Sequence, residues 1–367
     1  MSKLSQQDRA PVPKPVPSFW NAEPRALDDY RSTAELPLVS DVVIVGGGFA
    51  GVGTAYHLLK DNPDPPSIVL LEARKLCSGA TGRNGGHVKP DTYYNVPKYT
   101  KLYGATAAAE LAAFEASHVL AVKSLVEISS VSSKPDSEGM WTVQTPRGAI
   151  KTGKIVYATN GYTAQVLPEY VNTIVPVRGI CSHIESPKKQ DTPHLVNTYG
   201  IRFDALNNDY LIPRADGSII VGGARQRFWH NKERWFDNTR DDEAVEEAVS
   251  YFDGYMQRHF RGWEGSDAKT KEVWTGIMGY SSDFMPHIGD VPGKPGQFII
   301  AGFSGHGMPE ILLSSKGLAA MVRDGISFEK SGLPQIFKTS KSRISSKRSL
   351  LEESMQLLWD GKAKPKL

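Results

Sequence analysis

One segment near the start of the chain constrains the fold more than any other. Residues 41–60 read DVVIVGGGFAGVGTAYHLLK. The β-branched apolar run predicts a short buried strand, and the apolar positions after the glycines follow helical spacing. Gly46, Gly48 and Gly51 form the pattern G-x-G-x-x-G at the junction between the two. A strand, a glycine-rich turn and a helix in this order are typical of a Rossmann-type βαβ unit.

Each glycine has its own physical task in such a unit. Gly46 permits the tight turn, Gly48 lets a pyrophosphate approach the backbone, and Gly51 lets helix and strand pack closely. The phosphates then face the helix N-terminus, which favours negative charge. A second predicted strand, 67–73, ends at Glu72, where a carboxylate can meet the ribose hydroxyls of adenosine. The segment predicts dinucleotide binding, with a glycine-rich turn that binds nothing as the alternative.

Two further motifs distinguish between the common dinucleotides. The second strand runs into ARKLCSGATGRNGGH, residues 73–87, a polar loop with Arg83 and Asn84 among glycines. Flavoproteins need backbone and polar groups there to line the isoalloxazine, whereas NAD dehydrogenases generally have no equivalent loop. YATNG, residues 157–161, closes an apolar strand and resembles the ATG element of FAD enzymes. Both motifs favour FAD over NAD.

A third glycine cluster, GFSGHGM at 302–308, lies between a predicted buried strand and a helix. Backbone N–H groups and the positive helix end would point at whatever binds there. In a flavoprotein this target would be the N1–C2=O edge of the flavin, where a positive dipole stabilises the reduced ring. The alternative is an ordinary tight turn between a strand and a helix.

Taken in order, DVVIVGGGFAG, EARKLCSGATGRNGG, YATNG and AGFSGHGM resemble the D-amino-acid-oxidase-like FAD oxidoreductases. This superfamily includes sarcosine, glycine and γ-glutamylputrescine oxidases, and the resemblance spans about residues 11–340 and is strongest to fungal members. It implies hydride transfer from the carbon beside an amine nitrogen to flavin N5, followed by hydrolysis of the imine. It also implies a small amine or amino-acid-like substrate, with O2 as the electron acceptor that many members use and another acceptor as the alternative.

Four features depart from the pattern of this family. Relatives carry a segment after about residue 127 that is missing here, so a catalytically impaired FAD-binding pseudoenzyme is an alternative. Pro309 replaces the carboxylate-binding lysine of sarcosine-oxidase-like members, which favours an amine over a simple α-amino acid. Their O2-activating lysine aligns near Ile220, which predicts a slow reaction with O2. No cysteine lies in 274–283 for a covalent flavin link, so noncovalent FAD is expected.

The predicted fold class is α/β, a discontinuous Rossmann-type FAD-binding domain with an inserted α+β substrate domain. A flavin monooxygenase is a further alternative, although that class carries a late Gly-Asp motif where this chain has GFSGHG. Phe19 and Trp20 are expected to pin a proline-rich N-terminal arm onto the body. The predicted boundaries are 1–35 for the arm, 36–170 and 285–330 for the FAD-binding domain, 171–284 for the substrate domain and 331–367 for a basic surface tail. One helix is predicted at 241–260 in the substrate domain, and one short helix in the tail.

Charge and cysteine content exclude several classes of protein. The 43 basic and 40 acidic residues give a net charge of +3, which is not the footprint of a nucleic-acid binder. Two cysteines, Cys77 and Cys181, make neither a disulfide framework nor a zinc set. No run of eighteen apolar residues predicts a membrane span. Pro365-Lys366-Leu367 resembles the peroxisomal S-K-L signal, so a cytoplasmic or peroxisomal location is expected, with the oligomeric state left open.

His306, Arg83 and Arg225 are the candidate catalytic residues. His306 is a candidate proton donor or flavin contact, and Arg225 follows a strand that could face the flavin. The alternatives are a helix-start histidine satisfied by backbone and a solvated strand end. Tyr280 and Asp283 either line the substrate site or shape a loop. The predicted cofactor-binding residues are Gly46, Gly48, Phe49, Ala50, Gly51, Glu72, Ala73, Arg74, Ser78, Thr81, Arg83, Asn84, Gly85, Val131, Thr159, Asn160, Gly161, Gly302, Ser304, Gly305, His306, Gly307 and Met308.

Overall fold

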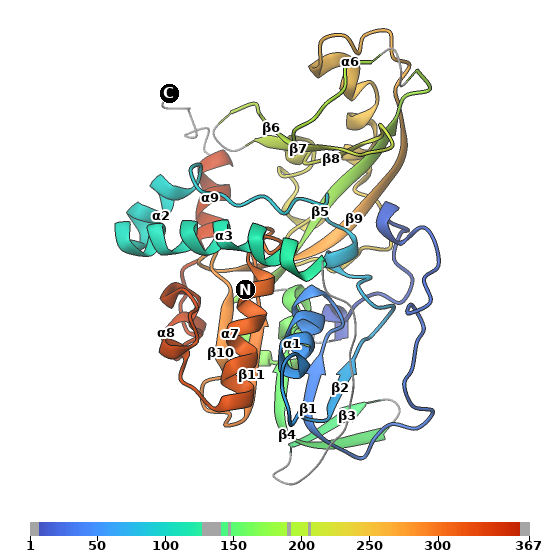
Figure 1. Ribbon diagram of the computed structural model, residues 1–367. Coiled ribbons are helices and arrows are strands. Elements are labelled where there is room, and N and C mark those ends of the chain that lie inside the picture. Colours follow the sequence, from blue (N-terminus) through green and yellow to red (C-terminus); the bar gives the residue numbers. More distant parts are fainter. Residues whose placement is uncertain (1–6, 127–140, 146–147, 189–191, 205–206, 360–367) are drawn as a thin grey trace.

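Two β-sheets organise the chain, one above the other in Figure 1. The computed structural model describes residues 7–126, 141–145, 148–188, 192–204 and 207–359. The lower sheet has six strands in the order β10-β11-β4-β1-β2, and β3 pairs with β4. Its strands are β1 (Val39–Val45), β2 (Ile68–Leu71), β3 (Trp141–Thr145), β4 (Gly148–Tyr157), β10 (His287–Asp290) and β11 (Gln297–Ala301).

The register of the lower sheet brings several loops to one edge. Strands β2, β1, β4 and β11 run parallel, and Val45 at the end of β1 pairs with both Leu71 and Tyr157. Tyr157 pairs in turn with Ile299 of β11. Because parallel strands end together, the loops that follow all four strands leave from the same edge, the usual place for ligands in such sheets.

Helices cover the lower sheet and cross the middle of the molecule. α1 (Phe49–Leu59) and α7 (Ile311–Asp324) pack side by side, and a Cβ on Gly53 would lie 2.9 Å from Ser315 Oγ. α2 (Val96–Tyr103) and α3 (Ala105–Val126) run across the view between the two sheets (Figure 1). α3 is rich in alanine and leucine, the residues with high helix propensity. No helix in the described part of the chain is long and apolar enough to cross a membrane.

The upper sheet is antiparallel, with five strands in the order β6-β7-β8-β5-β9. An apolar cluster that includes Trp235, Phe252 and Tyr255 packs against it. The helix predicted at 241–260 is broken into two short ones, because Gly254 takes the left-handed conformation (φ +65°). The elements are β5 (Ile174–Glu185), β6 (Tyr199–Arg202), β7 (Asn208–Pro213), β8 (Ile219–Gly222), β9 (Lys269–Ser281), α5 (Glu246–Val249) and α6 (Tyr255–His259).

The N-terminal arm lies against the body as the sequence predicts. The Trp20 indole N–H donates to the Asn84 carbonyl at 2.6 Å, and the Phe19 ring centroid lies 4.4 Å from that of His183. The arm thereby touches both the 73–87 loop and the upper sheet. The short α4 (Thr163–Val166) follows the YATNG motif at the end of β4.

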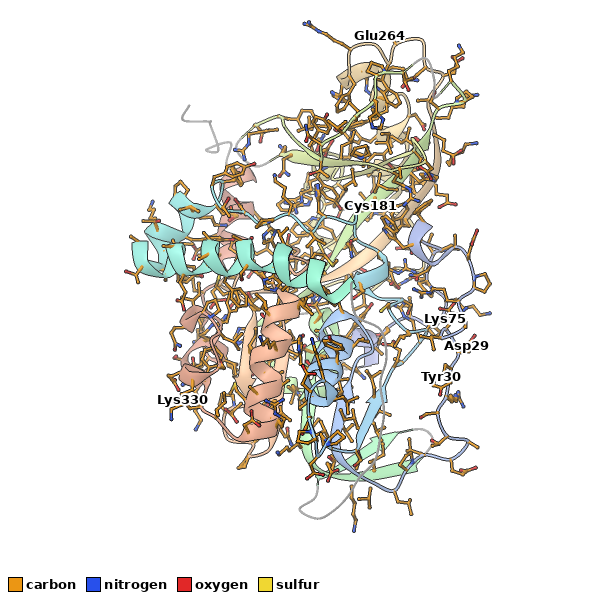
Figure 2. All side chains as sticks on the ribbon, in the orientation of Figure 1. Asp29, Tyr30, Lys75, Cys181, Glu264 and Lys330 are labelled. Carbon is orange, nitrogen blue, oxygen red and sulfur yellow. The ribbon has the colours of Figure 1, made fainter. Side chains whose placement is uncertain are left out.

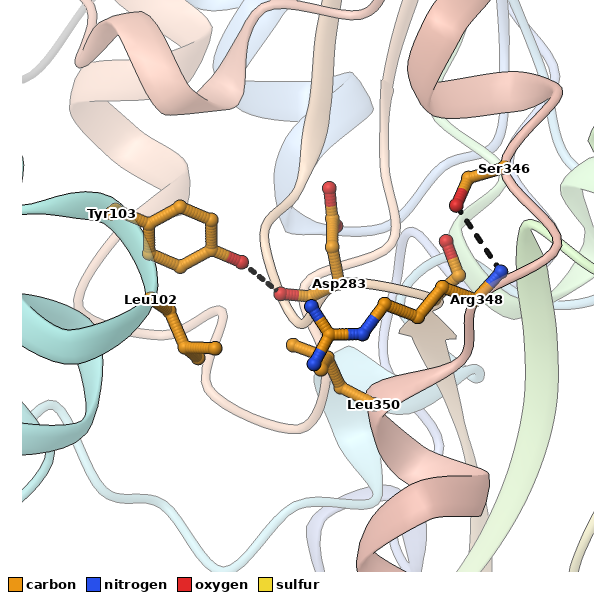
Figure 3. Close-up of a pocket in the computed structure, with 7 residues that line it drawn as sticks. Leu102, Tyr103, Asp283, Ser346, Arg348 and Leu350 are labelled. Carbon is orange, nitrogen blue, oxygen red and sulfur yellow. Dashed lines mark hydrogen bonds between the residues drawn. The ribbon is translucent and has the colours of Figure 1, made fainter.

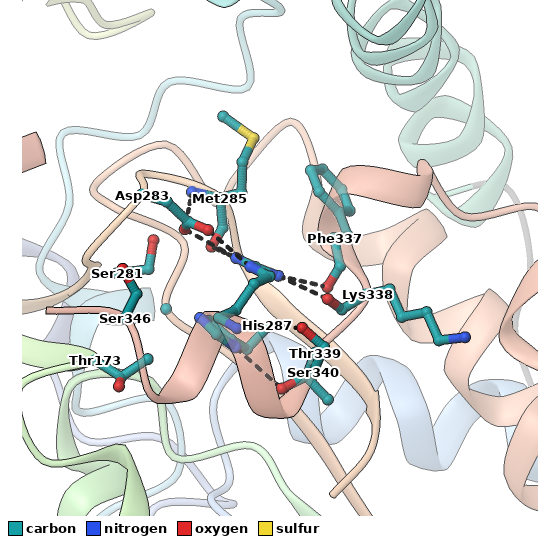
Figure 4. Close-up of polar contacts among 12 residues, drawn as sticks. Thr173, Ser281, Asp283, Met285, His287, Phe337, Lys338, Thr339, Ser340 and Ser346 are labelled. Atoms are coloured by element: carbon teal, nitrogen blue, oxygen red, sulfur yellow. Dashed lines mark hydrogen bonds and ion pairs between the residues drawn. The ribbon is translucent and has the colours of Figure 1, made fainter. Parts of the chain in front are cut away.

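The segment after residue 331 differs from the surface tail that its charge predicts. Its apolar residues Phe337, Leu351 and Met355 are buried, and α9 (Leu350–Trp359) is the predicted short helix. Arg343, in α8 (Lys341–Ile344), makes a two-bond ion pair with Asp283 at 2.7 and 2.9 Å and also donates to nearby carbonyls (Figure 4). Basic side chains thus stay at the surface or pair, while the apolar ones between them pack.

A small cavity of about 100 Å³ lies where this segment meets α2 (Figure 3). The Tyr103 hydroxyl donates to the Asp283 carbonyl at its wall. Figure 3 draws the lining residues, which are Leu102, Tyr103, Ser282, Asp283, Ser346, Arg348 and Leu350.

Candidate active site

The first glycine cluster forms a turn too tight for any side chain. Gly46 has φ +109°, and a Cβ there would lie 2.6 Å from the Ala158 carbonyl oxygen. A Cβ on Gly51 would lie only 1.9 Å from the Gly46 carbonyl oxygen. Gly48 is the N-cap of α1 and uses no capping side chain. The turn therefore forms a cradle of glycine backbone at a helix N-terminus, a position that suits a pyrophosphate.

Glu72 directly follows β2 and reaches back to this turn. Its Oε2 accepts a hydrogen bond from Gly47 N–H at 2.7 Å, and its Oε1 accepts one from Arg74 N–H at 3.0 Å. A carboxylate has about four lone-pair positions, so these two bonds leave capacity for ribose hydroxyls. The residue predicted to bind ribose thus lies beside the cradle, and it also fixes the backbone around the cradle.

The 73–87 loop is ordered by its own polar side chains. Thr81 Oγ1 accepts from Phe49 N–H at 2.9 Å, which links the loop to the first turn of α1. The Asn84 amide donates to Thr81 O at 2.7 Å and accepts from Gly86 N–H at 2.6 Å. These contacts hold the loop against the cradle, where the sequence predicts it to line a flavin.

Arg83 has a different position from the one expected of a catalytic residue. Its side chain is 2% exposed. Its guanidinium donates to the carbonyls of Ser78, Thr275 and Val16 at 2.7 to 2.9 Å. It also lies 3.4 Å from the Asp241 carboxylate. With these partners Arg83 joins the loop, the arm and β9, and the geometry supports an anchoring role.

Asp241 is the shared anion of this buried cluster and was not singled out from the sequence. Its side chain is fully buried, and Arg74 donates to both of its oxygens at 3.0 and 3.1 Å. Its backbone carbonyl accepts from Val16 N–H of the arm at 2.7 Å. Arg74 also donates to the Val12 carbonyl. Asp241 thus neutralises one of two guanidinium groups packed under the predicted flavin loop.

The YATNG motif and the third glycine cluster meet each other. Asn160, of the YATNG motif, accepts from the backbone N–H groups of Gly302 and Phe303 at 3.1 and 3.3 Å. Ser304 N–H donates to the Gly279 carbonyl at 2.7 Å, which ties the 302–308 loop to β9. Since Gly46 touches Ala158, the three predicted motifs are neighbours at one edge of the sheet.

His306 makes an ion pair that the sequence did not predict. Its Nε2 lies 2.8 Å from Oε2 of Glu115, a residue of α3 whose side chain is 1% exposed. Burial opposes charge on the imidazole, but the hydrogen bond and the charge of Glu115 outweigh it and raise the pKa of His306 to about 9. His306 is therefore an imidazolium at neutral pH.

One sequence signal could have found Glu115. Ala108, Leu111, Glu115 and His118 lie three or four positions apart on α3, and all four are buried. A carboxylate on a buried helical face needs a partner, because burying an unpaired charge is costly. The pattern predicts a cation opposite Glu115, although it does not say which one.

Arg225 and Tyr280 converge on the same region as the 302–308 loop. Arg225 donates to the Tyr280 hydroxyl at 3.2 Å, and its guanidinium carbon lies 5.0 Å from the centre of the Trp229 ring. A Cβ on Gly305 would lie 3.0 Å from the same hydroxyl. The structure thus brings Arg225, Tyr280 and the His306 loop together, whereas Arg83 lies apart in its own buried cluster.

Asp283 does not belong to this group. Burial favours the neutral form of its carboxyl, but the bonds from Arg343 outweigh burial and hold its pKa below the ordinary value. The carboxylate is therefore committed to Arg343, and Asp283 shapes the loop after β9.

The two cysteines lie in separate places. Burial raises the pKa of Cys77, whose thiol lies 3.5 Å from the Gly47 carbonyl beside the cradle. Cys181 is buried within the upper sheet (Figure 2), with its sulfur 3.1 Å from the Tyr210 hydroxyl. His87 packs on the Tyr210 ring, and burial lowers its pKa to about 4, so this imidazole is neutral.

The remaining predicted residues follow the same loops. Thr159 Oγ1 lies 3.0 Å from Thr163 Oγ1, next to the YATNG turn. Val131 and the terminal Pro365-Lys366-Leu367 lie outside the described residues. Ala50 is in α1, Ala73, Ser78 and Gly85 are in the 73–87 loop, Gly161 follows β4, and Gly307 and Met308 precede α7.

Comparison with known proteins adds family relationships to this geometry. A model of the DAO family, described as FAD dependent oxidoreductase, matches residues 41–124 and 124–321. The gamma-glutamylputrescine oxidoreductase of Escherichia coli (strain K12) is 37% identical over 67 residues, 18% of this chain and 15% of that protein. The glycine oxidase of Pseudomonas aeruginosa is 26% identical over 175 residues, 47% of this chain and 42% of that protein. The chain thus spans less than half the length of these curated relatives.

Solved structures give the same fold. The crystal structure of glycine oxidase from Geobacillus kaustophilus superposes with a TM-score of 0.55 at 14% identity, covering 83% of this chain and 99% of that one. At this identity the likeness concerns the fold alone, and it confirms the predicted α/β class with a Rossmann-like sheet.

Proposed function

We propose that this chain, which belongs to the DAO family of FAD dependent oxidoreductases, oxidises a C–N bond of a small amine or amino-acid derivative with noncovalently held FAD. One observation carries the proposal. Three glycine motifs far apart in sequence meet at the carboxyl edge of a parallel sheet, with Glu72 at one end and His306 in the third motif.

The residues present fit FAD in type and place. The cradle of Gly46 and Gly51 at the start of α1 suits the pyrophosphate, because these two glycines carry no side chains and a ligand can approach their backbone. Glu72 suits the ribose hydroxyls. The 302–308 loop, ordered by Asn160, suits the flavin edge. When bound, FAD would supply the acceptor for a hydride taken from the carbon beside the substrate nitrogen.

The chain's own residues would orient the substrate and hold charge. Arg225 donates to the Tyr280 hydroxyl, so this pair offers hydrogen bonds to a polar group of the substrate. His306 adds positive charge in the third motif. Pro309, which is buried, offers no cation for a carboxylate, and this supports an amine as substrate. We assign the lower sheet to FAD binding and the upper sheet to the substrate side.

A pseudoenzyme that binds FAD remains the second candidate, and one observation favours it. The two stretches that match the family model meet at residue 124, close to residue 127, after which the sequence lacks a segment that relatives carry. In relatives this segment contributes strands and a helix of the substrate domain. Its absence would remove part of the wall around the substrate.

Matched pairs of compounds test the proposed activity. Purified holoprotein is mixed without oxygen with butylamine and norvaline, and with cadaverine and lysine, which differ within each pair by one α-carboxylate. Amine oxidation predicts that the visible flavin bands bleach with an amine and less, or not at all, with its carboxylated partner. Bleaching by the amino acids alone would contradict the assignment from Pro309. If no compound in a broad panel of amines and amino acids bleaches the flavin bands, the result would favour the pseudoenzyme.

A further inference from the structure

The Glu115 carboxylate lies at the junction of three segments. It projects from α3, is 1% exposed, and accepts two hydrogen bonds through the same oxygen. One comes from Asp91 N–H at 2.6 Å, in the segment before α2. The other comes from His306 Nε2 at 2.8 Å, in the loop between β11 and α7. Glu115 therefore fixes the orientation of the His306 ring, with Nε2 directed towards α3.

Its neighbour His118, one helical turn further along α3, is neutral. His118 Nδ1 lies 3.1 Å from the Phe114 carbonyl and must donate to it, while Nε2 accepts from Leu313 N–H at 3.0 Å. With one donor and one acceptor used, the ring carries a single proton. Burial also lowers the pKa of His118. His118 is thus not a competing cation for Glu115.

The other ionisable groups around His306 leave Glu115 as its main counter-charge. Glu310 is 4% exposed, its Oε2 has no hydrogen-bond partner among the described residues, and burial raises its pKa well above the ordinary value. Burial therefore disfavours a negative charge on the Glu310 carboxyl. The Asp91 carboxylate accepts from backbone N–H groups at the start of α2. His87, on the segment before Asp91, is neutral.

We propose that Glu115 is a positioning residue that keeps His306 charged and directed through Nε2 towards α3. His306 then serves the reaction site as a cation with a proton on Nδ1, and it does not act as the base. Only the last step, the use of this cation, rests on the proposed function. The ion pair is a property of the chain itself.

This arrangement has a chemical consequence. A fixed cation in the 302–308 loop adds to the positive end of α7 and stabilises negative charge on a group bound there. The imidazolium cannot take a proton from an ammonium substrate, so the amine must arrive neutral or lose its proton to solvent.

Titration of His306 by NMR tests the pair without cofactor or substrate. The imidazole signal is assigned by its loss in a His306→Asn variant. The wild-type ring is expected to titrate near pH 9, and Glu115→Gln is expected to lower this pKa by about 1–3 units. Glu110→Gln is the matched control, because Glu110 is exposed on the same helix, and it should change nothing.

The outcomes are distinct. A pKa at or below 6.5 for His306 in the wild-type protein overturns the proposal. This measurement needs no variant, so the test still decides if Glu115→Gln fails to fold. An unchanged pKa in folded Glu115→Gln overturns it as well. Stability gives a second measure: since the His306 pKa is raised, the contribution of the pair is complete below pH 6.5 and is lost as the pH rises through about 9. Glu115→Gln should therefore destabilise the protein more at pH 6 than at pH 10.

Sulfite tests the role of the cation in the holoprotein, because it adds to flavins whose surroundings carry positive charge. At pH 8 the wild-type His306 is mostly charged, whereas in Glu115→Gln a pKa lowered by about 1–3 units leaves half or more of it neutral. Sulfite affinity is expected to fall about tenfold in Glu115→Gln, which corresponds to one pKa unit of interaction, and to stay unchanged in Glu110→Gln. Equal affinity in all three proteins overturns the role of the cation. A colourless protein would contradict the proposed function, and the NMR titration would still decide the pair.

Discussion

Gly51→Ala is expected to abolish flavin retention and to destabilise the protein by at least about 1–3 kcal/mol, the usual cost of overpacking. The added Cβ would lie 1.9 Å from the Gly46 carbonyl oxygen and 3.3 Å from Ile44 Cγ2. The nearest atom is backbone of a tight turn, so no flexible side chain can move aside. Relief requires α1 to shift away from β1, and that shift opens the cradle in which the pyrophosphate is proposed to bind.

Gly79→Ala is the matched control for this substitution. Gly79 lies in the 73–87 loop with φ −82°, and a Cβ there meets nothing within 4 Å. It should therefore change stability by no more than about 0.5 kcal/mol and leave flavin binding intact. Urea unfolding and the flavin-to-protein ratio after dialysis measure both effects. Full flavin retention in Gly51→Ala would contradict the contact between helix and turn.

Asp241→Ala is expected to destabilise the protein by about 3–5 kcal/mol, the usual cost of breaking a buried ion pair. Asp241 is fully buried and pairs with Arg74 and Arg83, whose side chains are 7% and 2% exposed. Removing it leaves the two buried guanidinium groups without the carboxylate that pairs with both. The arm should also loosen, since Arg74 and Arg83 donate to its Val12 and Val16 carbonyls.

The next residue provides the control. Asp242 pairs with Arg240, and their side chains are 31% and 55% exposed. An exposed pair contributes about 0–1 kcal/mol, so Asp242→Ala should have a small effect. Denaturant unfolding of both variants gives the comparison. Similar small losses in the two would show that the buried cluster does not hold the loop, the arm and β9 together.

The elements that the sequence predicted well are local ones. A strand, the three glycines of the G-x-G-x-x-G pattern and a helix lie within the twenty residues 41–60. The local residue types determine the backbone conformations that these elements need. The position of Glu72 beside the turn was predictable because its distance from Gly51 reflects one βα unit and the following strand. The YATNG and GFSGHGM motifs were likewise found because each is a turn at a strand end.

The interactions missed from the sequence join distant segments. Glu115 and His306 are paired although 191 positions separate them, and Asp241 meets Arg74 across 167. Arg83 was expected to be catalytic because it lies among flavin-loop glycines, but its donors are used by carbonyls of other segments. The net charge of the end of the chain led to the prediction of a surface tail for a related reason, since average composition does not show that apolar residues such as Phe337 and Met355 pack inside.

Flavin content is the most direct measurement of the central claim. Purified protein, incubated with FAD and desalted, is expected to show the visible bands of a bound flavin at about one FAD per chain. Acid precipitation should then release all of the colour into the supernatant, since no cysteine lies in residues 274–283. Colour that stays with the pellet would contradict noncovalent binding, and a protein that remains colourless after incubation with FAD would contradict the account as a whole.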